Sequence, residues 1–245
     1  MKMKRKVVAF CSLALLLCSS TATVQAENLN GDPQTTAVKT RKTAESQTAG
    51  NYSKVIPETN KIVNDKNDNF ALELSFPQVI IPGNSDAEEK INSYFRKAYN
   101  TAERKYLAKQ GTEDITSISE NYTISVNTKK YLIFRFKGMT YAYHAAHPLS
   151  WDASVAFRVK DGKKLKWQDL ISPKDKDKVT LEALNKKLAV HPLVTTFIPT
   201  KSGKWNYAQE YYIDQNREFH FLYGQYEIAP YAVGFVDVPM DVKIQ

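Results

Sequence analysis

Short runs of alternating apolar and polar residues recur through the second two-thirds of this chain. Side chains of a β-strand point to opposite faces in turn, so each run predicts a strand with one buried face. The predicted strands cover residues 71–76, 122–127, 129–137, 155–159, 165–167, 207–213, 218–223 and 234–244. Pro77 is expected to end the first strand, and Asp161-Gly162 is a dipeptide typical of a two-residue hairpin turn. These patterns predict a largely antiparallel sheet.

Two stretches show helical spacing instead. The first is expected to begin at Ser85, which stands three residues before Glu88 as in a capping box, and to end at Gly111. Its apolar face consists of Ile91, Tyr94, Phe95, Ala98, Ala102 and Tyr106. The second is expected to begin at Ser172-Pro173, an N-cap followed by proline, and to end at His191-Pro192. Its buried stripe consists of Leu181, Leu184 and Leu188.

One long and one shorter helix among mainly antiparallel strands indicate the α+β class. We expect two closely packed subdomains, a helix-plus-strands half at residues 66–149 and a sheet-plus-helix half at residues 150–245. No linker-like stretch separates the two halves, so we expect them to share one packed unit.

The N-terminus has the pattern of a secretory signal. Four basic residues within positions 1–6 precede an apolar run at 7–17, and Val24-Gln25-Ala26 offers small side chains to a signal peptidase. The apolar run is shorter than the ~20 residues of a membrane-spanning helix. We therefore expect a signal peptide at residues 1–26 and a secreted or cell-surface protein. A lipoprotein signal cleaved before Cys18 is the less favoured alternative, because Leu17 is bulky for it.

Removal of the signal changes the chemistry of the chain. Cys11 and Cys18 both lie in it, which excludes a thiol nucleophile and a cysteine-bound zinc or iron–sulfur centre. Four of the 34 basic residues are lost, so 30 basic against 26 acidic residues leave a net charge of +4 instead of +8. This modest charge and an extracellular location argue against a nucleic-acid partner. Residues 27–65 are polar, and we expect them to form a disordered leader.

Two sequence blocks resemble those of a known family. The first is Tyr141-Ala142-Tyr143-His144-Ala145-Ala146-His147-Pro148, and the second is Tyr226-Glu227-Ile228-Ala229-Pro230-Tyr231-Ala232-Val233-Gly234 followed by Phe235-Val236-Asp237-Val238-Pro239. Further matching features, in the same order, are Phe76-Pro77, Ile91-Asn92, Asp161-Gly162-Lys163-Lys164-Leu165 and Asp169-Leu170. Together they make the chain from Phe70 onward similar to the bacterial envelope family called domain of unknown function 3298. The N-terminal half resembles domain of unknown function 4163.

The resemblance implies a secreted or membrane-anchored bacterial protein. Relatives include extracellular parts of lysozyme-sensing anti-sigma factors and regions ahead of the catalytic domain in some peptidoglycan deacetylases. This sequence differs from both, since no transmembrane segment follows the signal and no deacetylase domain precedes Gln245. The family often has glycines where His144-Ala145-Ala146 stands here. The resemblance leads us to expect a recognition module for cell-wall glycan or for a lysozyme-like protein.

Aromatic residues beside polar groups are the candidate binding residues. Aromatic rings hold the apolar face of a sugar, and tyrosine and tryptophan are also enriched at protein interfaces. The candidates are Tyr143, His144, His147, Trp151, Tyr226, Glu227 and Tyr231. In the structural alternative, His147 fixes the turn into Pro148, while Pro230 and Gly234 shape the second block. The residues alone leave both interpretations open.

The histidines do not predict a metal site. His144 and His147 have a spacing that suits a metal on a helix, but on a strand they point to opposite faces. Candidate third ligands are Asp152, His191 and His220, and no spacing favours any of them. We therefore expect no metal and no cofactor.

The expected function is that of a secreted, non-catalytic recognition protein of the cell envelope. The sequence contains no nucleophile elbow, phosphate loop or His-Glu-x-x-His motif. One alternative is a peptidoglycan-modifying hydrolase or deacetylase-associated enzyme, with His147, Asp152 and Glu227 as acid–base candidates. Another is a structural partner of a second envelope protein.

Overall fold

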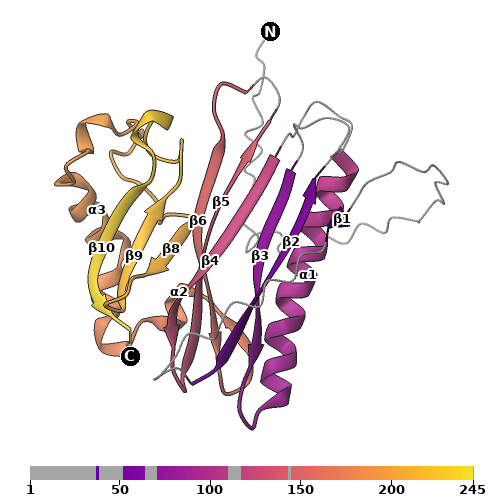
Figure 1. The fold of residues 1–245 in the computed structure, drawn as a ribbon. Coiled ribbons are helices and arrows are strands. Elements are labelled where there is room, and N and C mark those ends of the chain that lie inside the picture. The colour runs from indigo at the N-terminus through magenta and orange to yellow at the C-terminus, as the bar shows by residue number, and fades with distance from the viewer. Residues whose placement is uncertain (1–36, 39–51, 64–70, 110–116, 143–144, 245) are drawn as a thin grey trace, which may run out of the picture.

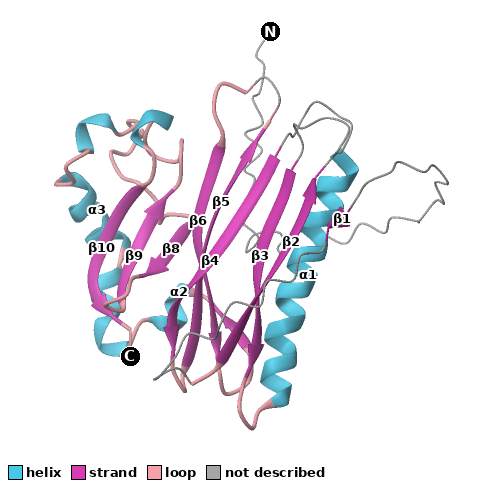
Figure 2. Cartoon of the chain, in the orientation of Figure 1, coloured by secondary structure: helices cyan, strands magenta, loops and turns pink. Residues whose placement is uncertain are grey.

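The computed structural model describes residues 37–38, 52–63, 71–109, 117–142 and 145–244. The predicted signal peptide and most of the predicted leader lie outside these residues. Residues 54–63 of that leader form a strand of the large sheet, so the prediction of disorder is wrong for them. The described residues form a seven-stranded sheet with a long helix against it, and a three-stranded sheet beside it (Figure 1 and Figure 2). This arrangement confirms the α+β class.

The elements have the following bounds. The large sheet contains β1 (Ala37–Val38), β2 (Lys54–Val63), β3 (Ala71–Ile80), β4 (Ser117–Asn127), β5 (Tyr131–Tyr141), β6 (Leu149–Arg158) and β7 (Lys163–Leu165). The small sheet contains β8 (Glu210–Ile213), β9 (Glu218–Tyr223) and β10 (Val236–Lys243). The α-helices are α1 (Ser85–Lys109), α2 (Trp167–Leu170) and α3 (Leu181–Ala189), and the 3-10 helices are η1 (Pro173–Val179), η2 (Val194–Thr196) and η3 (Tyr231–Val233).

The strands of the large sheet follow one another in sequence order. All pairs are antiparallel except β3 and β4, which are parallel from Ala71 opposite Ser117 to Leu74 opposite Glu120. A parallel pair needs a crossover connection, and α1 lies in that connection. The prediction of a largely antiparallel sheet is therefore confirmed.

Helix α1 covers one face of the large sheet with Ile91, Tyr94 and Phe95 of the apolar stripe predicted for it (Figure 1). The side chain of Tyr106 lies outside the described residues. Phe95 is buried against Phe134 and Phe136, which alternate along β5 and so share its helix-facing side. The buried Asn92 side chain accepts a hydrogen bond from the Val79 N–H and donates one to the Val79 carbonyl, both at 2.8 Å. These two hydrogen bonds satisfy backbone groups of β3 beyond Leu74, which is the last β3 residue that pairs with β4.

The small sheet stands beside the large one, with β8 nearest to β5 and β6 (Figure 1). One of its faces is apolar and packs in a core that includes residues of α3 and η1. The other face is polar, because Tyr212, His220 and Asp237 point to it. Arg135 of β5 reaches this polar face and lies 3.6 Å from the centroid of the Tyr212 ring.

Two local predictions, one about a strand end and one about a turn, are wrong. β3 continues past Pro77 to Ile80, because Pro77 pairs with another proline, Pro57, and lies beyond the residues that pair with β4. The turn at Asp161-Gly162 is part of a four-residue loop, since Arg158 pairs with Lys163. Gly162 ends that loop at φ +66°, and an added Cβ there would lie 2.6 Å from the Ala87 carbonyl oxygen.

The predicted second helix is divided in two. Ser172-Pro173 starts the 3-10 helix η1, and α3 begins only after a second N-cap, Thr180, whose hydroxyl accepts from the Ala183 N–H. Trp167, expected in a strand, instead begins α2, because the Asp169 carboxylate accepts from the Lys166 N–H and closes a helical turn. The expected division at residue 149 falls where β6 begins, and β6 pairs with β5 along its whole length.

Candidate functional site

The two sequence blocks meet in space. The imidazole of His147 stacks on the Tyr231 ring, with centroids 3.5 Å apart and planes 16° from parallel. The Tyr226 hydroxyl lies 2.9 Å from His147 Nε2. Since the Pro148 carbonyl near Nδ1 is only an acceptor, Nδ1 carries the proton and Nε2 accepts from Tyr226. We call His147, Tyr226 and Tyr231 the aromatic junction.

Tyr226 is the exposed member of the aromatic junction. Its side chain is at the surface, with 51% of the residue exposed, although its backbone has φ +64°. Residues other than glycine rarely adopt this left-handed conformation, which costs on the order of 1 kcal/mol or more. Such strain persists only where the surroundings hold it in place, and it is concentrated at functional positions.

Glu227 holds the turn that contains Tyr226. Its carboxylate accepts from the backbone N–H of Gly224 at 2.8 Å and of Gln209 at 2.9 Å. Burial raises the pKa of Glu227 above its ordinary value, and the two backbone hydrogen bonds offset only part of that effect. Both carboxylate oxygens are therefore bound within the protein, as expected for a residue that stabilises a turn.

Exposed apolar side chains lie next to the aromatic junction. Met139, Tyr141 and Leu149 are exposed at the end of the β5–β6 hairpin, where Met139 pairs with Ser150. The Ser150 N–H donates to the Gln225 side chain at 3.0 Å, which joins this hairpin end to the turn of Tyr226. Met139 and Tyr141 share one face of the hairpin, whereas Leu149 pairs with Thr140 and points to the other face.

Trp151 is part of the large sheet and not of this surface cluster. Its ring packs on Gly138, where an added Cβ would lie 2.3 Å from it, and its indole N–H donates to Glu120 at 2.6 Å. Glu120 is 1% exposed, and burial raises its pKa to about 7 although the bond from Trp151 acts in the opposite direction. Sequence reasoning missed Glu120, because a single acid ahead of an alternating run has no distinguishing spacing.

The Glu120 carboxyl should make folding stability depend on pH. Its pKa in the folded protein lies above the ordinary 4.5, so protonation stabilises the fold fully below pH 4.5, and this stabilisation is lost as pH rises through 7. We expect the free energy of unfolding of the wild type to fall by about 2 kcal/mol between pH 5 and pH 8 from this group. Glu120→Gln should remove that part of the fall. Urea unfolding of both proteins at the two pH values measures it, and equal pH dependence would contradict the assignment.

The candidate acid–base residues have separate partners. Asp152 forms a two-bond salt bridge with Arg135, with Nε–Oδ1 2.6 Å and Nη2–Oδ2 2.7 Å. Glu227 binds backbone amides, and His147 binds Tyr226. These contacts place the three residues in three different sets of interactions, so the geometry gives no support to a shared acid–base site.

The remaining candidate residues either lie apart from the aromatic junction or are not among the residues that the structure describes. Tyr143 and His144 are outside the described residues. His191 and His220 both contact Asp237, the first at its carbonyl oxygen (3.2 Å) and the second at its carboxylate (2.8 Å). His147 therefore belongs to a different part of the fold from His191 and His220, the candidate co-ligands.

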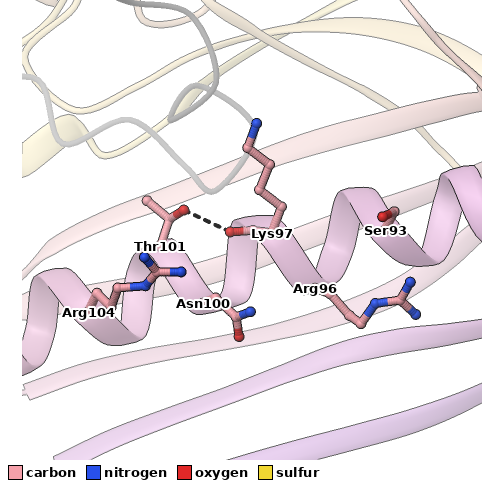
Figure 3. A pocket seen from close by; sticks show the side chains of 6 residues that line it. All are labelled: Ser93, Arg96, Lys97, Asn100, Thr101 and Arg104. Carbon is pink, nitrogen blue, oxygen red and sulfur yellow. Dashed lines mark hydrogen bonds between the residues drawn. The ribbon is translucent and has the colours of Figure 1, made fainter. Parts of the chain in front are cut away.

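Two hollows open on the other side of the large sheet from the small one. The larger, of about 500 Å³, is lined by six residues of α1: Ser93, Arg96, Lys97, Asn100, Thr101 and Arg104 (Figure 3). The smaller, of about 70 Å³, lies between α1 and the strands β2 and β3. The aromatic junction is built from other elements, so it presents a surface and does not line either hollow.

Among the described residues, no helix combines the length and the apolar character needed to cross a membrane. Helix α1 has 25 residues but carries many charged side chains.

Known proteins resemble this chain in fold and, over part of its length, in sequence. The family model described as "Protein of unknown function (DUF3298)" matches residues 168–243. A crystal structure of a DUF3298 family member from Bacteroides fragilis NCTC 9343 is similar with a TM-score of 0.52 at 15% identity. A DUF3298 family protein from Pseudomonas aeruginosa PAO1 has a TM-score of 0.51 at 11% identity. Each alignment covers 78% of this chain and 91% of the other, and no curated protein matches the sequence significantly.

At such low identity the two crystal structures show a shared fold alone. The family match adds sequence evidence for the C-terminal part, which contains the small sheet, Tyr226 and Tyr231. Residues 168–243 of this chain are a domain of the DUF3298 family.

Proposed function

We propose that this chain is a secreted, non-catalytic recognition protein of the cell envelope, and that the aromatic junction is its binding surface. The observation that carries the proposal is Tyr226, a half-exposed aromatic side chain in a strained backbone conformation that His147 and Glu227 help to hold. Rigid, exposed aromatic side chains are the typical anchors of binding surfaces. The secretion part of the proposal rests on the signal pattern at residues 1–26.

A lysozyme-like protein suits this surface better than a cell-wall glycan. The turn of Tyr226 is joined to the end of the β5–β6 hairpin, where the exposed side chains of Met139 and Tyr141 share one face of β5. Neighbouring exposed apolar side chains are typical of protein interfaces, while glycans need many polar partners for their hydroxyl groups. Here the polar atoms of His147 and Glu227 are already bound within the protein.

Replacement of Tyr226 by glycine should separate binding from folding. Glycine adopts φ +64° without strain, so Tyr226→Gly should change the free energy of unfolding by less than about 1 kcal/mol. Loss of a central aromatic anchor costs about 2 kcal/mol of binding free energy or more, which is roughly a thirtyfold loss of affinity. Calorimetric titration of the purified protein with lysozyme, and a pull-down with purified peptidoglycan, measure the effect.

Val190→Ala is the matched control, because Val190 is strongly exposed beyond α3 and should affect neither binding nor stability. If the wild type binds neither lysozyme nor peptidoglycan, the proposed function is wrong. Binding to peptidoglycan alone, lost in Tyr226→Gly, would keep the surface and replace the protein partner by a glycan. Binding that survives Tyr226→Gly would place the site elsewhere.

A further inference from the structure

The β8–β9 hairpin gathers three side chains of metal-ligating type. A ring nitrogen of His220 and one carboxylate oxygen from each of Asp214 and Glu218 lie within 4.8 Å of one another. The two acids are partly exposed, while His220 is only 8% exposed. Imidazole nitrogen together with carboxylate oxygen is a ligand set that divalent transition metals accept.

His220 has one ring nitrogen in use and one without a partner. Nδ1 lies 2.8 Å from the Asp237 carboxylate, whereas Nε2 is buried and has no hydrogen-bond partner. A carboxylate accepts hydrogen bonds, so Nδ1 carries the proton of a neutral imidazole and Nε2 presents a lone pair. A buried polar atom without a partner costs free energy, and a metal ion bound at Nε2 would remove that cost.

The strand register directs Nε2 toward the two acids. Asp237 pairs with Leu222, which follows His220 along β9, whereas Glu218 precedes His220 by two residues on the same face. Asp214 lies opposite Glu218 across the hairpin, where its backbone N–H donates to the Glu218 carbonyl. With Nδ1 turned toward Asp237, the other edge of the ring therefore faces Asp214 and Glu218.

Asp237 stands in the position of an outer ligand that orients a metal-bound histidine. Metal-binding histidines usually donate their second N–H to a carboxylate or carbonyl, which fixes the tautomer and the ring orientation. Here Asp237 accepts from His220 and also from the Tyr212 hydroxyl at 2.6 Å, and the Tyr212 ring stacks on the imidazole at 4.4 Å. The ring of His220 is thereby held from two sides.

We propose that Asp214, Glu218 and His220 bind one divalent transition-metal ion, for which Zn²⁺ is the best match, and that Asp237 orients His220. Zinc takes imidazole and carboxylate ligands at about 2.0–2.2 Å, so small rotations of the two partly exposed acids bring their oxygens to the ion. The partly exposed acids leave the remaining coordination position open to water. This site is separate from the aromatic junction and does not depend on the function proposed for it.

Zinc titration of the metal-free, untagged protein tests the proposal. We expect one Zn²⁺ per chain by calorimetry and by elemental analysis after dialysis. At about a hundredfold excess over the dissociation constant, the midpoint of thermal unfolding should rise by roughly 5–10 °C. Glu218→Gln should weaken zinc binding by more than about tenfold, and Asp237→Asn, which keeps the shape of the orienting residue, by about 10–100-fold.

Glu182→Gln is the matched control, since Glu182 is an exposed acid on α3 that pairs with Lys186. It should bind zinc as the wild type does. Absence of stoichiometric zinc from the wild type would overturn the proposal, because water in place of the ion would then account for the cluster. Zinc binding that Glu218→Gln leaves unchanged would overturn it as well. The Asp214→Asn protein, which keeps the side-chain acceptor for the Glu218 N–H, should repeat the loss while remaining folded.

Discussion

Phe95→Ala should lower the free energy of unfolding by about 4 kcal/mol, the largest effect expected in this protein. Phe95 is buried, and its ring centroid lies 5.2 Å from that of Phe134, 5.5 Å from Phe157 and 5.8 Å from Phe136. The truncation removes the ring from the centre of the contact between α1 and the large sheet, and strands on the other side hold the cavity open. Chemical denaturation followed by circular dichroism measures the change.

Phe95→Leu is the control for this prediction, because leucine fills much of the space and should cost less than half as much. Zinc affinity should stay unchanged in both variants, since α1 and the β8–β9 hairpin lie on different sides of the large sheet (Figure 1). A loss below about 1 kcal/mol in Phe95→Ala would show that α1 does not pack as described.

Arg135→Met should lower the free energy of unfolding by about 3 kcal/mol. Arg135 neutralises the buried Asp152 through two hydrogen bonds and covers the Tyr212 ring, so it links the large sheet to the small one. Methionine preserves most of the side-chain volume but leaves the Asp152 carboxylate buried without its main partner. Lys137 is 3.4 Å from the same carboxylate and largely exposed, and it offsets only part of the loss.

A double-mutant cycle distinguishes the charge effect from lost packing. Arg135→Met combined with Asp152→Asn should be more stable than the sum of the two single changes predicts, because no unpaired charge remains. Arg158→Met is the matched control, since its partner Asp161 is partly exposed to solvent and the change should have little effect on stability. Additive losses in the cycle would contradict the role of Arg135 as the partner of a buried charge.

Periodicity predicted the fold class and the elements with one apolar face, because burial of that face is what forms them. Helix α1 and the strand β5 are examples, since their stripes meet at Phe95 and Phe134. Local hydrogen bonds decided the details that periodicity missed. The Asp169 carboxylate converts Trp167 from a predicted strand residue into the start of a helix, and Thr180 begins α3 seven residues after Pro173.

The residues of the candidate binding site could be predicted from the sequence, but the contacts between them could not. His147, Tyr226 and Tyr231 were all identified as candidates, but 79 residues separate His147 from Tyr226, and no local pattern encodes their contact. The metal-ligating residues Asp214 and Glu218 were missed for a related reason. They become neighbours of His220 only when β8 and β9 pair, and their spacing resembles that of any polar hairpin.

The aromatic junction is the surface through which we propose that this protein binds its partner. Hydrogen–deuterium exchange of the purified protein, with and without saturating lysozyme or soluble peptidoglycan fragments, tests this proposal most directly. The bound partner should slow exchange at residues 145–151 and 225–234, while the exposed face of α1 and the hairpin at residues 214–218 exchange at unchanged rates. Slower exchange on α1 or at the hairpin, with residues 225–234 unaffected, would contradict the proposal.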